Sequence, residues 1–262
     1  SCKKNDETVS EEFENTFQLS ADQAVADNLT EDANDMFMQV ADEQGIAGGF
    51  APGGPVVIND FIPCATVTIT PLSGFPKTIV IDFGTSCTDI NGNVRSGKIN
   101  ITLSDSVRKS GSVAVMTFTN YFINGFKIEG THTWTNTSIA PGRSWTHRAE
   151  NGKITAPGGR YWTHSGLRTV VQTAGVATPT RIDDVFSITG NHTVTNSANI
   201  SRDITVLDAL IKRTDCANIS GGKLKVQGPN HYAVIDFGDA ATCDNLATLS
   251  IDGRTPRVIV LR

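Results

Sequence analysis

A five-residue segment that occurs twice, each time between two cysteines, constrains the fold of this chain more than any other feature. Val80-Ile81-Asp82-Phe83-Gly84 recurs as Val234-Ile235-Asp236-Phe237-Gly238. Both copies follow an apolar, strand-like run, and the two cysteine pairs have nearly the same separation. The repeat indicates two similar β-hairpins, one near each end of the ordered part of the chain.

The cysteines of each segment are placed to meet at the open end of a hairpin. Paired residues of a hairpin lie symmetrically about its turn, so the midpoint of each cysteine pair marks the expected turn. These midpoints fall in turn-forming clusters, Ser73–Pro76 and Gly228–Asn230. We therefore predict disulfides Cys64–Cys87 and Cys216–Cys243. The alternative is four unpaired buried thiols, since free cysteine packs as a small apolar residue.

From residue 56 to the end of the chain, apolar and polar residues alternate with the period of two that is typical of β-strands. Expected strands cover 56–61, 64–70, 77–84, 97–104, 112–123, 126–137, 143–150, 160–172, 184–197, 202–213, 222–227, 231–238, 246–251 and 256–261. The predicted fold is mainly β, a long-stranded antiparallel curved sheet or sandwich with one N-terminal helix packed against it. The β domain, 56–262, is one unit or two related halves.

The residues before this domain divide into three parts. Residues 1–19 are expected to be a tether, in which Phe13, Phe17 and Leu19 could form one short added strand. Residues 20–44 predict an acidic amphipathic helix, because apolar residues recur there at helical spacing. Residues 45–55 are rich in Gly and Pro and predict a linker.

Local signals set the expected limits of the helix. Ser20 and Gln23 have the spacing of a capping box, and Gly45 is a typical helix stop. Asn28-Leu29-Thr30 could divide the helix into two pieces.

Charge is distributed unevenly along the chain. From Asn5 to Pro76 there are thirteen Asp and Glu and no Lys or Arg, whereas twenty basic and fourteen acidic residues follow. One interpretation is that the acidic segment docks on the β part. We prefer the other, a solvated acidic tether. No concentrated basic patch is present, so nucleic acid is not an expected partner.

The central hairpin has the strongest turn signal in the chain, Asn124-Gly125. Its register places Ile123 opposite Phe126 and Tyr121 opposite Ile128. The alternation then predicts one buried face, made of Val113, Val115, Tyr121, Ile123, Phe126, Ile128, His132 and Trp134. The other face carries Lys127, Glu129, Thr131, Thr133 and Thr135 and is expected to be wet.

The beginning of the chain, Ser1-Cys2-Lys3-Lys4-Asn5-Asp6-Glu7, resembles the start of a mature bacterial lipoprotein with Cys2 as the lipidated residue. Lys4 followed by Asn5-Asp6-Glu7 is similar to the tether of surface-exported lipoproteins of Bacteroidetes. The resemblance implies an outer-membrane, lipid-anchored protein on the extracellular face, with the membrane as partner through Cys2. An oxidising compartment agrees with the predicted disulfides.

Further segments extend this resemblance to most of residues 60–262. The cysteine hairpins, Asp183–Gly190 and the ending Ile235–Gly238, Cys243-Asp244-Asn245 and Asp252-Gly253 are similar to a group of uncharacterised Bacteroidetes cell-envelope lipoproteins. The resemblance implies an envelope lipoprotein with disulfides. It implies no activity, cofactor or binding residue.

Two sets of acidic and amide residues are candidate sites. Asp82 and Asp236 occupy matching positions and could act as a carboxylate pair in glycoside hydrolysis. We prefer to interpret them as exposed or turn-bonded residues. Asp89, Asn91 and Asn93 have the spacing of calcium ligands, although Val94 and Asn100 stand where an EF-hand needs Gly and Glu. The competing interpretation is a plain turn on Asn91-Gly92.

Histidines and aromatic residues have structural interpretations that we favour. His132, His147, His164, His192 and His231 form no close ligand pair in the sequence, and His132 and His192 are expected to face inward beside Gly130 and Gly190. Trp134, Trp145, Trp162, Tyr121 and Tyr161 predict core packing or, if they are exposed together, a carbohydrate-stacking platform.

Three functions follow from these patterns. The first is a lipid-anchored envelope module for binding or structure, with a glycan as the suggested ligand. The second is a carrier of an apolar ligand in a β half-barrel closed by the helix. The third is a hydrolase, for which the sequence holds no positive motif. No cofactor is expected.

Overall fold

The structure is a computed structural model of the chain that describes residues 9–48, 63–178 and 180–261. One long helix, α1 (Val9–Glu43), precedes fourteen strands that form a single antiparallel sheet. The strands are β1 (Thr66–Thr70), β2 (Lys77–Asp82), β3 (Cys87–Thr88), β4 (Val94–Leu103), β5 (Val113–Ile123), β6 (Phe126–Asn136), β7 (Arg143–Thr155), β8 (Tyr161–Ala174), β9 (Val185–Asn196), β10 (Ser201–Arg213), β11 (Gly221–Gln227), β12 (Tyr232–Asp239), β13 (Leu246–Ile251) and β14 (Arg257–Val260). The predicted mainly β fold, a curved antiparallel sheet with one N-terminal helix, is confirmed.

Strand order in the sheet follows the order of the chain. Each strand from β4 to β14 pairs with the next one, β2 pairs with β1 and β4, and the short β3 extends the edge of β4. Antiparallel neighbours joined by short turns need no crossover, so the alternation along each strand was enough to locate most of them. The expected strand at 56–61 lies outside the described residues.

Both cysteine hairpins have their predicted disulfides. Cys64 is bonded to Cys87 beside the β1–β2 hairpin, and Cys216 is bonded to Cys243 beside the β11–β12 hairpin. The repeated Asp-Phe-Gly segment has the same role in each hairpin. The carboxylates of Asp82 and Asp236 accept a hydrogen bond from the backbone N–H two residues later, at Gly84 and Gly238.

The central hairpin has the predicted register at its turn, with Ile123 opposite Phe126 and Tyr121 opposite Ile128. The prediction that Val113 and Val115 share the buried face of Tyr121 is wrong. Register shifts between Thr117 and Tyr121, where Asn120 has a φ of 46°. A bulge of this kind moves the rest of a strand to the opposite face. Ala114 and Met116 are the buried residues instead.

Helix α1 is longer than the sequence indicates. It begins at Val9, so the expected tether over 1–19 and the helix start at residue 20 are wrong for residues 9–19. Phe13, Phe17 and Leu19 are helical rather than part of a strand. The hydroxyl of Ser20 donates to the Thr16 carbonyl one turn earlier, as it does inside a helix.

The helix also does not break at Asn28. The Asn28 side chain donates to the Ala24 carbonyl and accepts from the backbone N–H of Ile219, so it links the helix to the segment before β11. The predicted stop is confirmed, because the helix ends at Glu43 and Gly45 follows with a φ of 66°.

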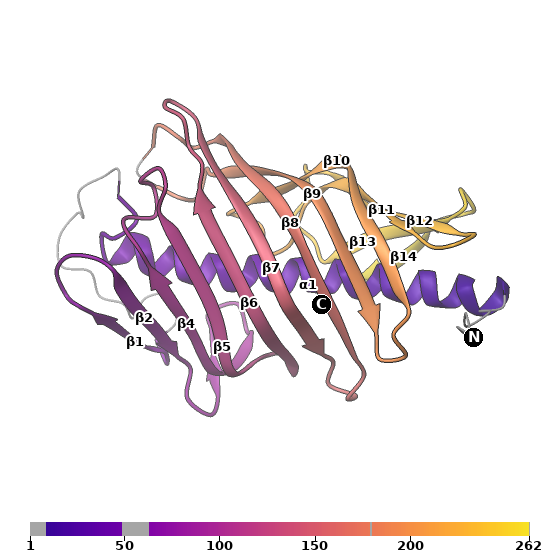
Figure 1. Cartoon of the computed structure of the whole chain (residues 1–262), viewed down its shortest axis with the longest axis horizontal. Coiled ribbons are helices and arrows are strands. Elements are labelled where there is room, and N and C mark those ends of the chain that lie inside the picture. Colours follow the sequence, from indigo (N-terminus) through magenta and orange to yellow (C-terminus); the bar gives the residue numbers. More distant parts are fainter. Residues whose placement is uncertain (1–8, 49–62, 179, 262) are drawn as a thin grey trace, which may run out of the picture.

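The sheet curves around the helix. Figure 1 shows α1 crossing the strands from the side of β11 and β12, where it begins, to the side of β1 and β2, where it ends. Nearly every side chain from Leu19 to Ala33 is buried, on all sides of the helix. The preferred interpretation of a solvated acidic tether is therefore wrong, and the alternative of an acidic segment docked on the β part is confirmed.

Candidate functional site

The space between α1 and the concave face of the sheet contains many buried polar and charged side chains, and it forms the candidate site. Helix α1 contains ten acidic residues and no basic residue. Seven ion pairs join its carboxylates to basic side chains of the β part, namely Asp22–Arg160, Asp27–Arg168, Asp32–Arg95, Asp35–Lys212, Asp35–Arg181, Asp42–Arg181 and Asp42–Arg108. Charge complementarity along its length therefore holds the helix.

The Arg95 guanidinium is the most heavily engaged of these groups. It forms two hydrogen bonds with Asp32, two with Asp89 and one with the Tyr121 hydroxyl, and it lies over the Phe83 ring. Burial lowers the pKa of Arg95, but Tyr121 and Asp32 raise it by more, so the pKa lies above its ordinary value. Arg95 thus remains charged and joins β4 to the helix.

The predicted calcium ligands form a turn that faces Arg95. One oxygen of Asp89 accepts the backbone N–H groups of Asn91 and Asn93, and the other accepts from the Asn93 amide and from Arg95. Gly92 completes the turn with a φ of 81°. The predicted turn on Asn91-Gly92 is confirmed, whereas a calcium ion would have to displace Arg95 from Asp89.

Four histidines gather on the concave face beneath the middle of the helix. They come from four successive strands, with His132 on β6, His147 on β7, His164 on β8 and His192 on β9. His132 Nδ1 lies 3.0 Å from His147 Nε2, and the His132 and His164 rings are 5.9 Å apart. The His147 ring stacks on Trp134 at 4.1 Å. His132 and His192 face inward as predicted, but the sequence did not indicate that the histidines gather.

Glycines on neighbouring strands make room for two of these rings. Gly152 pairs with His164 and Gly166 pairs with His192 across adjacent strands. A Cβ atom at Gly152 would lie 2.5 Å from His164 Nε2, and one at Gly166 would lie 2.1 Å from His192 Cδ2. Any side chain at either glycine would therefore displace an imidazole.

The histidines are neutral near pH 7. Burial lowers the pKa of His132 to about 3, with a further decrease from His164, and it lowers the pKa of His164 to about 4, with a further decrease from Arg168. Burial, together with Arg168 and the neighbouring imidazoles, also lowers the pKa of His147 and of His192. The cluster contributes hydrogen-bonding nitrogens rather than charge.

Many polar atoms in and around the cluster have no hydrogen-bond partner. They are His132 Nε2, His164 Nε2, both ring nitrogens of His192, Arg168 Nε, Trp162 Nε1 and Gln23 Oε1. Each buried polar atom without a partner costs about 1–3 kcal/mol, so such atoms are uncommon in stable cores. The middle of the interior is therefore polar but incompletely satisfied.

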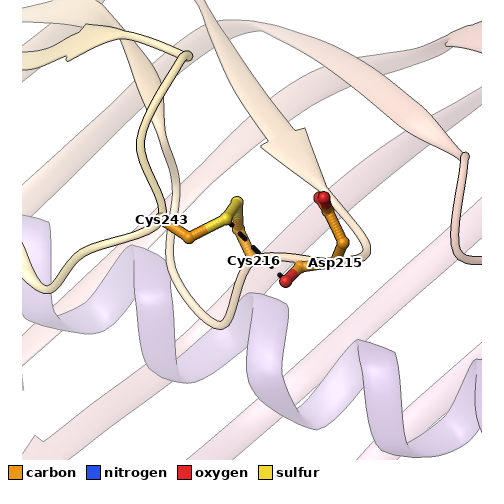
Figure 2. Close-up of side chains that lie close together, drawn as sticks. All are labelled: Asp215, Cys216 and Cys243. Carbon is orange, nitrogen blue, oxygen red and sulfur yellow. Dashed lines mark hydrogen bonds between the residues drawn. A yellow bond between two sulfur atoms is a disulfide. The ribbon is translucent and has the colours of Figure 1, made fainter.

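The ring nitrogens do not converge on a common point. Among the described residues, the one set of three potential donor groups within 4.8 Å of one another is Asp215, Cys216 and Cys243. Figure 2 shows that the two sulfur atoms of this set are bonded to each other, and Cys243 Sγ lies 3.8 Å from the Asp215 carbonyl oxygen. Disulfide sulfurs are not thiolates, so this set is no metal site.

Two hollows border the helix. A cavity of about 50 Å³ lies between its second half and the middle strands, with Glu31, Trp134, Trp145, Phe186 and Lys212 among its walls. A wider groove of about 560 Å³ has the last turns of the helix as one wall. The groove is lined by Asp32, Asp35, Met36, Gln39, Asp42, Asp89, Asn91, Asn93, Arg95, Thr180, Arg181, Ile182, Thr214, Asp215, Cys216 and Ala217.

The other candidate residues are not brought together. Asp82 on β2 and Asp236 on β12 belong to hairpins at opposite ends of the strand order, and each forms an ion pair with a neighbouring lysine, Lys98 or Lys223. The interpretation as turn-bonded residues is confirmed. Trp134, Trp145, Trp162 and Tyr121 are buried, which confirms core packing, and Tyr161 is 38% exposed beside Lys153.

Comparison of the chain with protein-family models, curated proteins and solved structures gives no match. Within the described residues, no helix is long and apolar enough to cross a membrane. Cys2 lies outside those residues, so its predicted lipidation stays a prediction.

Proposed function

We propose that this chain is a binding or structural module of the cell envelope, held to the outer membrane by lipid on Cys2 and facing the exterior. The observation that carries this proposal is the pair of disulfides, because structural disulfides persist in oxidising compartments and are rare in the cytosol of most organisms. The lipoprotein-like start of the chain and its similarity to Bacteroidetes envelope lipoproteins support the same location.

A glycan is the ligand class that we propose for this module. The 560 Å³ groove is lined mainly by carboxylate, amide, hydroxyl and guanidinium groups. Such groups donate and accept the hydrogen bonds that sugar hydroxyls require. Recognition would depend on these polar walls, because the tryptophans that could have stacked on a sugar are buried in the described structure.

The two alternatives have less support. A carrier of an apolar ligand needs an open apolar concave face, but α1 occupies that face and leaves a cavity of about 50 Å³. A hydrolase needs paired groups in a cleft, and Asp82 and Asp236 are bound to separate lysines in separate hairpins. Both alternatives would require the helix or the hairpins to move.

Anchoring is tested by expressing the chain behind a lipoprotein signal peptide in a Bacteroidetes host, as wild type and as Cys2→Ala. We expect the wild type to incorporate labelled fatty acid, to partition with outer membranes and to be cleaved when intact cells are treated with protease. Cys2→Ala should lose the label and the membrane association, whereas Ser1→Ala serves as the matched control. A Cys2→Ala protein that remains on the membrane would refute the anchor.

Binding is tested on the lipid-free chain with a panel of soluble glycans. A ligand of the native state raises the melting temperature by mass action. We expect at least one glycan to do so, and Asn91→Ala in the groove to reduce the effect. If the whole panel leaves the melting temperature unchanged, the glycan proposal is lost and a structural role remains.

A further inference from the structure

Glu31 is an exception among the carboxylates at the middle of α1. Asp22, Asp27 and Asp32 each form an ion pair with an arginine of the β part. Glu31 is 8% exposed, yet no described residue hydrogen-bonds to its carboxylate or forms an ion pair with it within 4.0 Å. The helix therefore presents one buried, unpaired carboxylate toward the 50 Å³ cavity, whose wall it forms.

The walls of this cavity are largely aromatic and aliphatic. Trp134, Trp145 and Phe186 line it from β6, β7 and β9, and Met38 closes it from the helix. A water molecule occupies roughly 10–15 Å³ on the same measure, so about 50 Å³ admits a group of three or four non-hydrogen atoms. Size and wall chemistry together fit a short aliphatic chain with one polar end.

The basic groups in the cavity wall are already engaged. Lys212 Nζ donates to the carbonyls of Cys216 and Arg213 and pairs with Asp35 at 2.8 Å, which uses its three N–H groups. Arg181 forms ion pairs with Asp35 and Asp42. These cations are therefore committed to other acceptors.

The other charged groups of the wall are bound as well. Arg108 pairs with Asp42 and donates to the Gly48 carbonyl. The third acidic wall residue, Asp184, accepts a hydrogen bond from Gln172. The three basic wall residues thus face four carboxylates, those of Asp35, Asp184 and Glu31 in the wall and that of Asp42 beside it. When Glu31 is ionised, it carries a negative charge that no contacting cation neutralises.

We propose that the cavity beside Glu31 binds the end of a small primary alkylammonium group. The ammonium donates a hydrogen bond to the Glu31 carboxylate and supplies the missing charge. Its short alkyl chain packs against Trp134, Trp145 and Phe186. Aromatic rings also attract a cation that is removed from water. A charged hydrogen bond in a buried setting is among the stronger polar contacts that a protein can offer.

The charges that face Glu31 agree with this ligand. Burial raises the pKa of Glu31 to about 7, Asp35 and Asp27 on the helix raise it further, and Lys212 on β10 and Arg168 on β8 oppose the increase. Glu31 is thus protonated in much of the population at neutral pH. A bound ammonium favours the ionised form, so binding below pH 7 should release a proton.

The test uses the disulfide-intact, lipid-free chain with n-propylammonium chloride as probe. Two molecules of matched size, 1-propanol and propionate, separate charge from apolar packing, and potassium chloride controls for ionic strength. At pH 8 we expect the melting temperature to rise with propylammonium by several degrees more than with the other three. Glu31→Gln should abolish this difference, whereas the exposed control Glu150→Gln should retain it.

Calorimetry supplies an independent readout. At pH 6, titration in two buffers of different ionisation enthalpy should show release of a fraction of a proton that approaches one, and at pH 9 it should show almost none. An equal response to 1-propanol would indicate an apolar cavity alone and overturn the proposal, as would binding that survives Glu31→Gln. No response to propylammonium up to 100 mM, roughly a hundredfold above a millimolar Kd, would also overturn it. None of these outcomes bears on membrane anchoring.

Discussion

Single residues decide how the polar interior is built. His164 and His192 fit only because Gly152 and Gly166 stand opposite them, and the backbone there approaches the imidazole rings closely. Each buried ring is held neutral, which avoids the larger cost of burying a charge. The interior tolerates polar groups mainly where a neighbouring residue is small or of opposite charge.

Glu31 predicts a pH dependence of stability. Its pKa rises from 4.5 to about 7 on folding, because burial disfavours the ionised form. The protonated form stabilises the fold fully below pH 4.5. As pH rises through 7 this stabilisation, roughly 3 kcal/mol of unfolding free energy, is lost. Glu31→Gln cannot ionise and escapes this loss. Between pH 5 and pH 8 its free energy of unfolding should therefore increase relative to that of the wild type.

Urea unfolding at pH 5 and pH 8 measures this difference, with Glu150→Gln as the exposed control. A gap between Glu31→Gln and the wild type that is the same at both pH values would show that the Glu31 carboxylate is already ionised at pH 5 in the folded chain.

The alternation of apolar and polar residues predicted that His132 and His192 face inward, because this pattern can be read within a single strand. It could not show that His147 and His164 join them. That neighbourhood depends on the register of three strand pairs, and β6–β7 and β7–β8 both contain shifts. Glycine and histidine at paired positions, as in Gly152 and His164, are the signal that could have revealed the cluster.

At the scale of elements, the helix illustrates what composition misses. The sequence showed an acidic segment followed by a basic domain, but a count of charges does not reveal where the basic side chains point. Arg95, Arg168 and Lys212 each lie on an inward-facing strand position and meet a carboxylate of α1. From Leu19 to Ala33 the helix is also buried on nearly all sides, acidic residues included, which a pattern based on one apolar face does not predict.

The buried pair Asp27–Arg168 tests how strongly the helix is held. Arg168 Nη2 lies 2.8 Å from Asp27 Oδ1, and both side chains are less than 5% exposed. Asp27→Asn keeps the shape but leaves a buried guanidinium without its counter-charge, so we expect a loss of about 3 kcal/mol or more. The surface pair Asp105–Lys109 is 32% and 63% exposed, so Asp105→Asn should destabilise the chain far less than Asp27→Asn does.

Urea unfolding measures the free energy and the m-value of both variants. Hydrogen exchange then shows whether α1 itself becomes less protected. Equal losses in the two variants would mean that the interior ion pairs do not hold the helix more strongly than a surface pair does.

For the whole molecule, the sheet curves around the helix far enough to bring strands that are distant in the strand order to one groove. Asp89, which follows β3, and Cys216, which precedes β11, line the same 560 Å³ groove although they belong to opposite parts of the strand order. The strands themselves follow from alternation and turn residues. Their curvature around α1 does not follow from these signals, because it accumulates from small twists and bulges over fourteen strands.

The disulfides stabilise the two parts of the sheet that meet at this groove. They close loops with sequence separations of 23 and 27 residues, and loops of that length contribute roughly 3 kcal/mol each on the chain-entropy model. We expect Cys64→Ser/Cys87→Ser and Cys216→Ser/Cys243→Ser each to lose about that much in urea unfolding. A variant without either bridge should lose about 6 kcal/mol, which is comparable to the whole stability of many domains. Reduction of the wild type should reproduce the variant that lacks both bridges.

If the bridges act instead on the native packing around the groove, the Cys216–Cys243 variant alone should also change glycan binding at temperatures where the chain remains folded.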